Sequence, residues 1–334
     1  MNMAPQIDTD TALLDVCDLS VAFPTPRGPI LPVNHASFRV GRGRSLGLVG
    51  ESGSGKSVTL RAILGIVPPP GRVASGTVRL GPDDLTRLSA SRLRAVRGKA
   101  ISMNFQDPMA SLNPVLTVGD QIVETLRVKA GLRGRAAIDH AVSLFERVGI
   151  REPRHRLRDF PHQFSGGMAQ RVMIAIAIAA EPQLLLADEP TTALDVSIQD
   201  QVLDLLAALK AELGMAMILV SHDIGVIARS CDQVAVMYAG RILERGRVED
   251  VLLHPRHPYT AMLIGSVPSL VPNIGRKPLA TISGQLPDLT TVREGCPFRT
   301  RCPHAREACA AVGMALDAPE EGHGSACPFV EASA

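Results

Sequence analysis

Short apolar runs alternate with segments of helical periodicity along the first three quarters of the chain. Three uninterrupted runs have the length and composition of buried strands: 46–49, 184–187 and 215–220. Apolar residues recur at helical spacing in two further segments, which predict amphipathic helices packed on a core: 138–148 and 198–213. A run of nine apolar residues between Arg171 and Glu181 predicts a buried helix. The alternation of strands and helices predicts an α/β fold.

Proline usage marks a boundary in the chain. Ten of its 25 prolines lie in residues 255–334, where loops and short turns replace the alternating pattern. We therefore place a domain boundary near Pro255, with one unit at residues 1–254 and a C-terminal extension at residues 255–334.

The composition is that of a globular protein and narrows the range of partners. Of the 334 residues 46% are hydrophobic and 20% are charged, and the net charge is +2. No basic tract is interleaved with aromatic residues, which argues against nucleic acid as the main partner. No segment approaches the roughly 20 apolar residues that span a bilayer. The acidic start does not resemble a signal peptide, so a cytoplasmic location with reduced thiols is expected.

The apolar run at 46–49 leads directly into a phosphate-binding motif. Residues 50–57 have the pattern G-x-x-x-x-G-K-S, and an apolar, helix-like segment follows. Glycines in such a loop let backbone N–H groups point at phosphate oxygens, and the helix start adds positive potential. Lys56 is expected to reach the β- and γ-phosphates and Ser57 to ligate Mg²⁺; a plain glycine-rich turn is the alternative. The residues predicted to contact nucleotide here are Gly50, Glu51, Ser52, Gly53, Ser54, Gly55, Lys56, Ser57 and Val58.

The strand in QLLLADEP delivers two carboxylates at its C-terminal end. Asp188 is suited to hold Mg²⁺ through water, because hard cations prefer oxygen ligands. Glu189 is placed to polarise an attacking water. A solvated strand end is the alternative, but the preceding P-loop favours the catalytic interpretation.

The sequence contains a second glycine-rich helix start that could bind an anion: Ser165-Gly166-Gly167, followed by Gln170. Because the P-loop at residues 50–57 is already expected to bind the phosphates, this second anion-binding helix start needs an explanation. With the P-loop and Asp188-Glu189 it resembles the ATP-binding-cassette (ABC) ATPases. Other landmarks of that family follow the family's order: Phe23 in VAFPTPRG, Gln106 in Phe105-Gln106-Asp107-Pro108, the D-loop Ala193-Leu194-Asp195 and His222 in Ser221-His222-Asp223.

The resemblance covers residues 13–250 and implies an architecture: a P-loop (RecA-like) core, an N-terminal antiparallel β subdomain and a helical subdomain at about 107–180. It also implies a head-to-tail dimer that sandwiches two ATP molecules. Its implied site residues are as follows: Ser165, Gly166 and Gly167 on the γ-phosphate of ATP held by the opposite subunit, Asp195 at the opposing site, Phe23 stacked on adenine, Gln106 on Mg²⁺ and the attacking water, and Glu189 and His222 in hydrolysis.

Four segments resemble the ATP-binding subunits of oligopeptide, dipeptide and nickel importers: VGESGSGKS, NFQDPMASLNP, FSGGMAQRVMIA and HPRHPYTAMLIGSVP. This branch implies an ATPase that energises peptide import, bound peripherally to the cytoplasmic face of the inner membrane. It implies two permease subunits, docked near residues 109–125, and an extracytoplasmic solute-binding protein. Met168 in the signature favours a heterodimer with a second, unlike ATPase subunit. Import of nickel or another small solute, and a soluble ABC ATPase outside transport, are the alternatives.

Four of the six cysteines lie in the C-terminal extension: Cys296, Cys302, Cys309 and Cys327. They lack the paired C-x₂-C spacing of typical zinc sites, and four thiolates can hold either zinc or a four-iron cluster. The importer branch has members whose C-terminal extension carries CPF-x-x-R-C and further cysteines around a [4Fe-4S] cluster, and CPFRTRC resembles that sequence. We therefore expect an iron–sulfur cluster with a structural role, and zinc or free or disulfide-bonded thiols are the alternatives.

Overall fold

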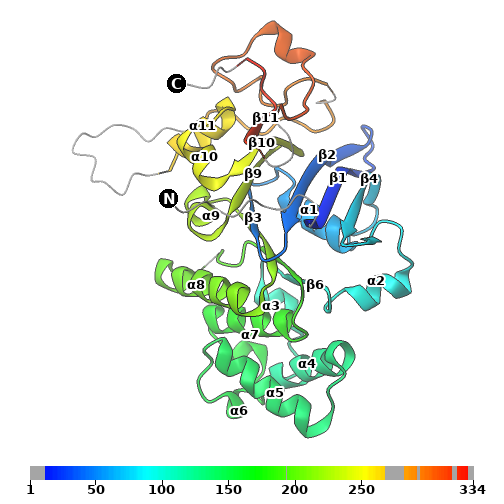
Figure 1. Cartoon of the computed structure of the whole chain (residues 1–334), viewed down its shortest axis with the longest axis vertical. Coiled ribbons are helices and arrows are strands. Elements are labelled where there is room, and N and C mark those ends of the chain that lie inside the picture. Colours follow the sequence, from blue (N-terminus) through cyan, green and yellow to red (C-terminus); the bar gives the residue numbers. More distant parts are fainter. Residues whose placement is uncertain (1–11, 193, 268–281, 292–293, 318–321, 330–334) are drawn as a thin grey trace, which may run out of the picture.

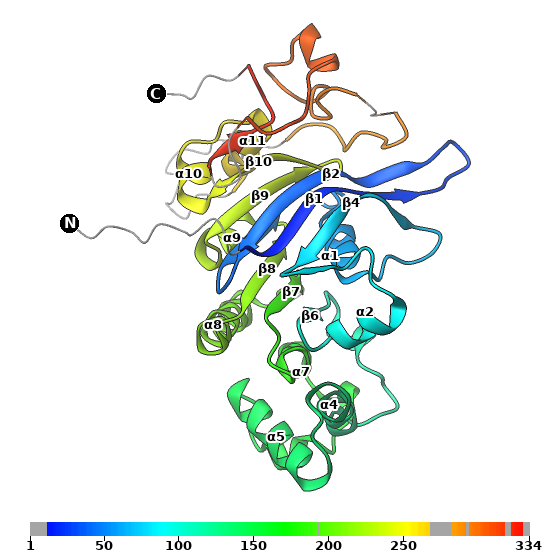
Figure 2. The same cartoon turned by 45° about the vertical axis from the view of Figure 1, so that its right-hand side comes forward.

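The computed structural model describes residues 12–192, 194–267, 282–291, 294–317 and 322–329. Within them, two sheets lie in the middle of the molecule, a group of helices forms one end, and the C-terminal segment lies at the opposite end (Figures 1 and 2). This confirms the predicted α/β fold with an antiparallel β subdomain and helices beside a P-loop core. No helix in the described ranges combines the length and the apolar character needed to span a bilayer.

The larger sheet contains the three predicted apolar strands side by side. Its strand order is β11-β10-β9-β3-β8-β7-β6, and the strands from β9 to β6 are parallel. The bounds are β3 Ser45–Val49, β6 Ile101–Asn104, β7 Leu184–Asp188, β8 Ala216–Ser221, β9 Gln233–Tyr238, β10 Arg241–Arg247 and β11 Gly324–Ser325. Parallel strands end at one edge of a sheet, where α/β proteins bind their ligands. The residues that follow β3, β6, β7 and β8 therefore meet at that edge.

The smaller sheet is antiparallel, with the order β2-β1-β4-β5. Its strands are β1 Ala12–Phe23, β2 Ile30–Gly41, β4 Arg72–Leu80 and β5 Asp83–Asp84. Its apolar residues, among them Leu14, Leu19 and Phe38, share one buried cluster with Leu46 and Leu60 of the P-loop core. This shared core fixes the smaller sheet against β3 and the helix that follows it.

The helices group into those around the sheets and those of the helical end (Figure 1). Their bounds are α1 Lys56–Leu64, α2 Ala90–Val96, α3 Pro108–Ser111, α4 Val118–Thr125, α5 Gly134–Arg147, α6 Pro153–Arg156, α7 Gly166–Ile178, α8 Val196–Leu213, α9 Ile224–Ser230, α10 Val248–Leu253 and α11 Pro258–Gly265. Shorter turns are the π-helical η1 Leu126–Ala130 and the 3₁₀ segments η2 Pro161–Gln163 and η3 Glu307–Ala310.

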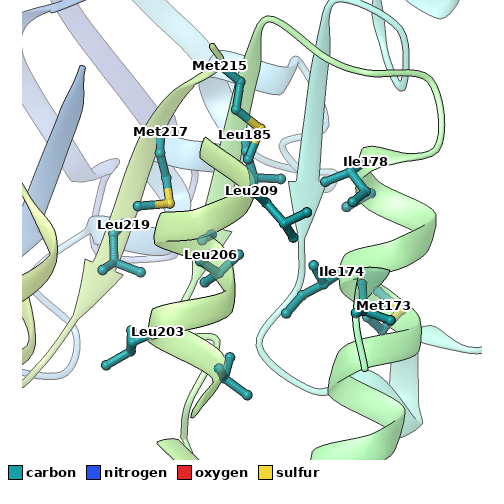
Figure 3. Close-up of a cluster of buried hydrophobic side chains, with 14 of the residues drawn as sticks. Met173, Ile174, Ile178, Leu185, Leu203, Leu206, Leu209, Met215, Met217 and Leu219 are labelled. Carbon is teal, nitrogen blue, oxygen red and sulfur yellow. The ribbon is translucent and has the colours of Figure 1, made fainter. Parts of the chain in front are cut away.

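Helices α7 and α8 pack together over the larger sheet. Figure 3 shows Ile174 and Ile178 of α7 facing Leu206 and Leu209 of α8, with Leu185 of β7 close to Leu209, and all five are buried. Burial of this apolar stripe explains why the predicted amphipathic helix at 198–213 forms here. The packing also joins the second half of α7 to β7 and α8.

The C-terminal segment packs onto the larger sheet. Strand β11 pairs with β10 through Ser325 and Gly324. The ring of Phe298 lies 5.2 Å from those of both Tyr238 of β9 and Tyr259 of α11, measured between centroids. All three rings are fully buried. The extension is therefore joined to the core by both a strand pair and an aromatic cluster.

Candidate functional site

The P-loop connects the end of β3 to the start of α1 at the carboxyl edge of the sheet. Gly55 caps α1 with φ 107°, and Gly50 has φ 155°. A Cβ at either position would collide with a backbone carbonyl, that of Pro32 or of Met237 respectively. Glycine is therefore required at both positions by backbone geometry.

Lys56 is folded back onto the loop that precedes it. Its Nζ donates to the carbonyl oxygens of Gly50 and Glu51 at 2.7 and 3.0 Å, and the side chain is buried. Burial lowers the pKa of Lys56, while the nearby carboxylates of Glu189 and Asp188 oppose the shift. The ammonium group thus lies in the loop where a bound phosphate would meet it.

Ser57 and Asp188 form the second part of the site. The Ser57 hydroxyl donates to Oδ1 of Asp188 at 2.8 Å, although the two residues are 131 positions apart. Burial raises the pKa of Asp188, which is almost fully enclosed at the end of β7. A hydroxyl and a buried carboxylate oxygen side by side have the chemistry that Mg²⁺ prefers.

The carboxylate of Glu189 is surrounded by three polar side chains. Its Oε2 is 3.2 Å from Nε2 of Gln106, 3.3 Å from Nδ1 of His222 and 2.8 Å from the hydroxyl of Thr192. The three predicted catalytic residues, from the ends of β6, β7 and β8, are thus brought together by the parallel sheet. Thr192 was not among the predicted residues, and its only signal in the sequence is its place three residues after Glu189 in DEPTTALD.

The signature residues lie in a different neighbourhood. Ser165 caps α7 and accepts a hydrogen bond from the Met168 N–H at 3.4 Å. A Cβ at Gly166 would contact Leu194, and one at Gly167 would meet Ile198 of α8. The signature therefore lies against the D-loop side of α8.

Three further predicted residues lie outside these groups: Asp195, Phe23 and Val58. Asp195 begins α8 as its N-cap residue, while Ala193 of the D-loop lies outside the described residues. Phe23 ends β1 and its ring lies against Gly71. Val58 follows Ser57 in the first turn of α1 and packs against the core shared by the two sheets.

A contact that the sequence analysis did not anticipate joins the extension to the P-loop. Nη1 of Arg301 lies 3.0 Å from both carboxylate oxygens of Glu51. The Tyr259 hydroxyl accepts from the Glu51 N–H at 3.0 Å. No local pattern could have revealed this pair, because 250 positions separate residues 51 and 301.

The four C-terminal cysteines converge on one cavity with a volume of about 30 Å³: Cys296, Cys302, Cys309 and Cys327. Burial raises the pKa of Cys296 to about 11. His257 also lines the cavity; its Nδ1 accepts from the Tyr259 N–H, whereas its buried Nε2 has no partner. Within the described ranges no three His, Cys, Asp or Glu side chains are close enough to hold a metal ion. The cysteines therefore converge, but not at ligating distances.

A P-loop at the centre of a parallel sheet, with an antiparallel sheet beside it and a glycine-led signature helix, defines an ABC-type ATPase cassette. Solved structures agree: a dimeric ATP-binding cassette, MJ0796, bound to ADP and phosphate has a TM-score of 0.64 and 25% identity, and the match covers 70% of this chain and 98% of that one. The cassette cbiO1 from Clostridium perfringens has a TM-score of 0.62 and 26% identity, with 73% and 92% covered.

Sequence comparisons place the chain more narrowly. The family model "ABC transporter" matches residues 33–192, and "Oligopeptide/dipeptide transporter, C-terminal region" matches residues 243–309. The oligopeptide transport ATP-binding protein OppD of Salmonella typhimurium is 46% identical, with 89% of this chain and 88% of the relative covered. The dipeptide transport ATP-binding protein DppD of Bacillus subtilis is also 46% identical, with the same shares covered. The chain belongs to the ABC transporter family, in its group of oligopeptide and dipeptide transport ATP-binding proteins.

Proposed function

We propose that this protein hydrolyses ATP to energise import of small peptides, as a peripheral subunit on the cytoplasmic face of the inner membrane. The observation that carries the proposal is identity of 46% over 89% of the chain to peptide transport ATP-binding proteins. An intact cluster of Gln106, Glu189 and His222 supports an active ATPase. The division into a cassette at residues 1–254, with a helical subdomain at about 107–180, and an extension at 255–334 is part of the same proposal.

The geometry suggests a role for each group. The P-loop N–H groups and Lys56 would hold the phosphates, and bound Mg²⁺, held by Ser57, Gln106 and Asp188, would neutralise charge on the transferred group. Glu189 would orient and polarise the attacking water, while Gln106 and His222 keep its carboxylate in place. Phe23 would support the adenine. Hydrolysis then depends on positioning and charge stabilisation.

The second half of each site would come from another subunit. Support comes from the position of the signature, which lies beside Leu194 and Ile198 while the P-loop contacts β2, β9 and the extension. We propose that Ser165, Gly166, Gly167 and Asp195 serve the ATP of the opposite subunit. Because Met168 departs from the usual signature glutamine, we propose an unlike ATPase subunit as the partner.

The helical end offers a surface for two permease subunits, which an extracytoplasmic solute-binding protein would supply with peptide. Val115 is 76% exposed and Met109 is 42% exposed in the segment 109–125. A groove of about 590 Å³ next to it is lined by Val123 of α4, by Arg127 and Val128 of η1, and by the residues that lead into α5: Leu132, Arg133 and Gly134. Exposed apolar side chains beside a groove are suited to receive a helix of a membrane partner.

Reconstitution tests this function. The complex with its permeases, partner ATPase and binding protein should hydrolyse ATP faster when peptide is present and accumulate labelled peptide in vesicles. Nickel uptake instead of peptide uptake would support the nickel alternative, and failure to co-purify with permeases in detergent would support a soluble ABC ATPase outside transport.

The role of Glu189 has its own test. Glu189→Gln should lower kcat at least about 100-fold, because general-base contributions have that size, while ATP binding persists. Thr192→Ala removes only one partner of the same carboxylate and should lower kcat far less. Unimpaired hydrolysis by Glu189→Gln would refute the assignment.

We propose in addition that the four cysteines hold a [4Fe-4S] cluster with a structural role, with zinc as the alternative. The convergence of four thiols beside the unpartnered Nε2 of His257 supports a group with sulfur ligands, because that N–H could donate to sulfur. Binding would require deprotonated thiols, and a cation would reverse the rise that burial causes in the pKa of Cys296. Anaerobic purification followed by iron, sulfide and zinc analysis decides: colourless protein with zinc alone would overturn the cluster.

A further inference from the structure

Arg301 connects the four-cysteine segment to three other parts of the molecule. Its Nη1 contacts the Glu51 carboxylate and donates to the Tyr238 hydroxyl of β9 at 3.1 Å. Its Nε and Nη2 donate to the carbonyl oxygens of Ser283 and Ile282 at 2.8 and 3.1 Å. All three guanidinium nitrogens therefore have partners, and only 4% of the side chain is exposed.

Glu51, the residue that Arg301 holds, is itself part of the P-loop. Its N–H is bound by the Tyr259 hydroxyl and its carbonyl oxygen accepts from Nζ of Lys56. The carboxylate, the N–H and the carbonyl of one residue are thus fixed by Arg301, Tyr259 and Lys56 respectively. Movement of Glu51 would therefore shift one of the two carbonyl acceptors that orient the Lys56 ammonium group.

The backbone of Arg301 is anchored independently of its side chain. The Arg301 N–H donates to the Phe298 carbonyl at 2.9 Å, and the Phe298 ring is fully buried against Tyr238 and Tyr259. The guanidinium group is therefore presented to the P-loop from a rigid support. Arg301 also contacts the segment that contains Leu286, through the Ser283 and Ile282 carbonyls. Leu286 lies against the P-loop, 3.4 Å from where a Cβ of Gly53 would stand.

We propose that Arg301 is a positioning residue for ATP binding: it holds the P-loop through the Glu51 carboxylate, so that the C-terminal extension forms part of the nucleotide site. This rests on the proposed role of the P-loop in binding ATP. Because the Arg301 side chain is enclosed and hydrogen-bonded at all three nitrogens, while that of Glu51 is 28% exposed, the pair holds one loop conformation more firmly than an ion pair exposed on both sides would. Arg301 does not contact the attacking water in this arrangement, so its loss should affect binding of ATP more than the hydrolytic step.

The test compares Arg301→Ala, Arg301→Lys and Arg247→Ala in the full chain and in the assembled transporter. Arg247 is a matched control, because its pair with Glu249 is exposed on both sides. For Arg301→Ala we expect the Kd and KM for ATP to rise about tenfold, the size expected when one charge-assisted anchor is lost, with kcat changed less than about twofold. Arg301→Lys should recover part of the affinity, and Arg247→Ala should leave both constants unchanged.

Three outcomes separate the possibilities. If Arg301→Ala lowers the melting temperature but leaves Kd and KM within twofold of the parent, the residue is only structural and the proposal fails. If Glu51→Ala weakens binding and Arg301→Ala adds nothing in the double variant, the pair acts as one unit, as proposed. If Lys56→Ala binds ATP as tightly as the parent protein, the P-loop role itself is wrong, which is a distinct result.

Discussion

At the scale of single residues, Asp232 shows how a side chain outside the nucleotide site fixes the strand that leads to it. Its Oδ2 accepts from the backbone N–H and the hydroxyl of Ser45, both at 2.7 Å, and from Nζ of Lys210 at 3.0 Å. These bonds join the first residue of β3 to α8 and to the loop before β9. The start of the strand that carries the P-loop is therefore held by one carboxylate.

This network predicts a pH dependence of stability. Burial alone would raise the pKa of Asp232, but hydrogen bonds from Ser45 and Lys210 outweigh it and lower the pKa below the ordinary 3.8. A lowered pKa gives stability that is fully present above the ordinary value and is lost as the pH falls through the folded-state value. Asp232→Asn should cost about 1 kcal/mol at pH 7, a modest value because the side chain is partly exposed. Denaturant titrations should show this difference shrinking below pH 4, and a constant difference down to pH 2 would contradict it.

At the scale of elements, the sequence predicted the strands and helices that have long apolar runs or apolar residues at helical spacing. Strands β3, β7 and β8 and helices α5, α7 and α8 lie where apolar runs or helical stripes predicted them. The antiparallel pairing of β1 and β2 could not be derived in the same way, because irregularities in register interrupt its alternation at four points. The two-residue strand β11 is too short to carry a period and forms because β10 offers it an edge.

Gly55, in the loop that leads into α1, allows a test of the proposed phosphate-binding loop. Gly55→Ala places a Cβ against the Pro32 carbonyl at φ 107°, a conformation that costs a residue with a side chain of order 1–3 kcal/mol even without the clash. We expect a lower unfolding midpoint and an ATP affinity reduced at least about tenfold, since the start of α1 must move. Gly81→Ala is the matched control: it also has positive φ, but no atom lies within 4 Å of the added Cβ. Equal losses of affinity in both variants would show that backbone strain alone is responsible.

At the scale of the whole molecule, the C-terminal extension is bound to the cassette at more than one place. The fully buried Glu244 of β10 accepts from the N–H groups of Arg256 and His257 at 2.7 and 2.9 Å and lies 2.6 Å from Nε2 of His323. With the pair of Arg301 and Glu51, this carboxylate ties the extension to the cassette across long sequence distances. Proline content marked where alternating strands and helices give way to loops and short turns. Contacts between distant residues leave no periodic signal in the sequence, so these two connections could not be predicted from it.

Loss of the cysteine site is therefore expected to affect both the C-terminal extension and the P-loop that Arg301 contacts. Cys302 directly follows Arg301, so Cys302→Ser should loosen the described parts of residues 282–317 and weaken ATP binding without abolishing it, since the P-loop, Ser57 and Asp188 remain. Hydrogen exchange in that region should accelerate at least about tenfold, as expected when a local unit opens more readily, and the Kd for ATP should rise no more than in Arg301→Ala.

Cys17→Ser provides the matched control, because Cys17 is an exposed thiol on β1 outside the extension. It should change neither the exchange rates nor the Kd. If Cys302→Ser accelerates exchange in the extension while the Kd for ATP stays at the parent value, the aromatic cluster of Tyr238, Tyr259 and Phe298 holds Arg301 in place without help from the cysteines. If exchange is unchanged, the cysteines do not hold the extension together, and the structural role proposed for their cluster is wrong.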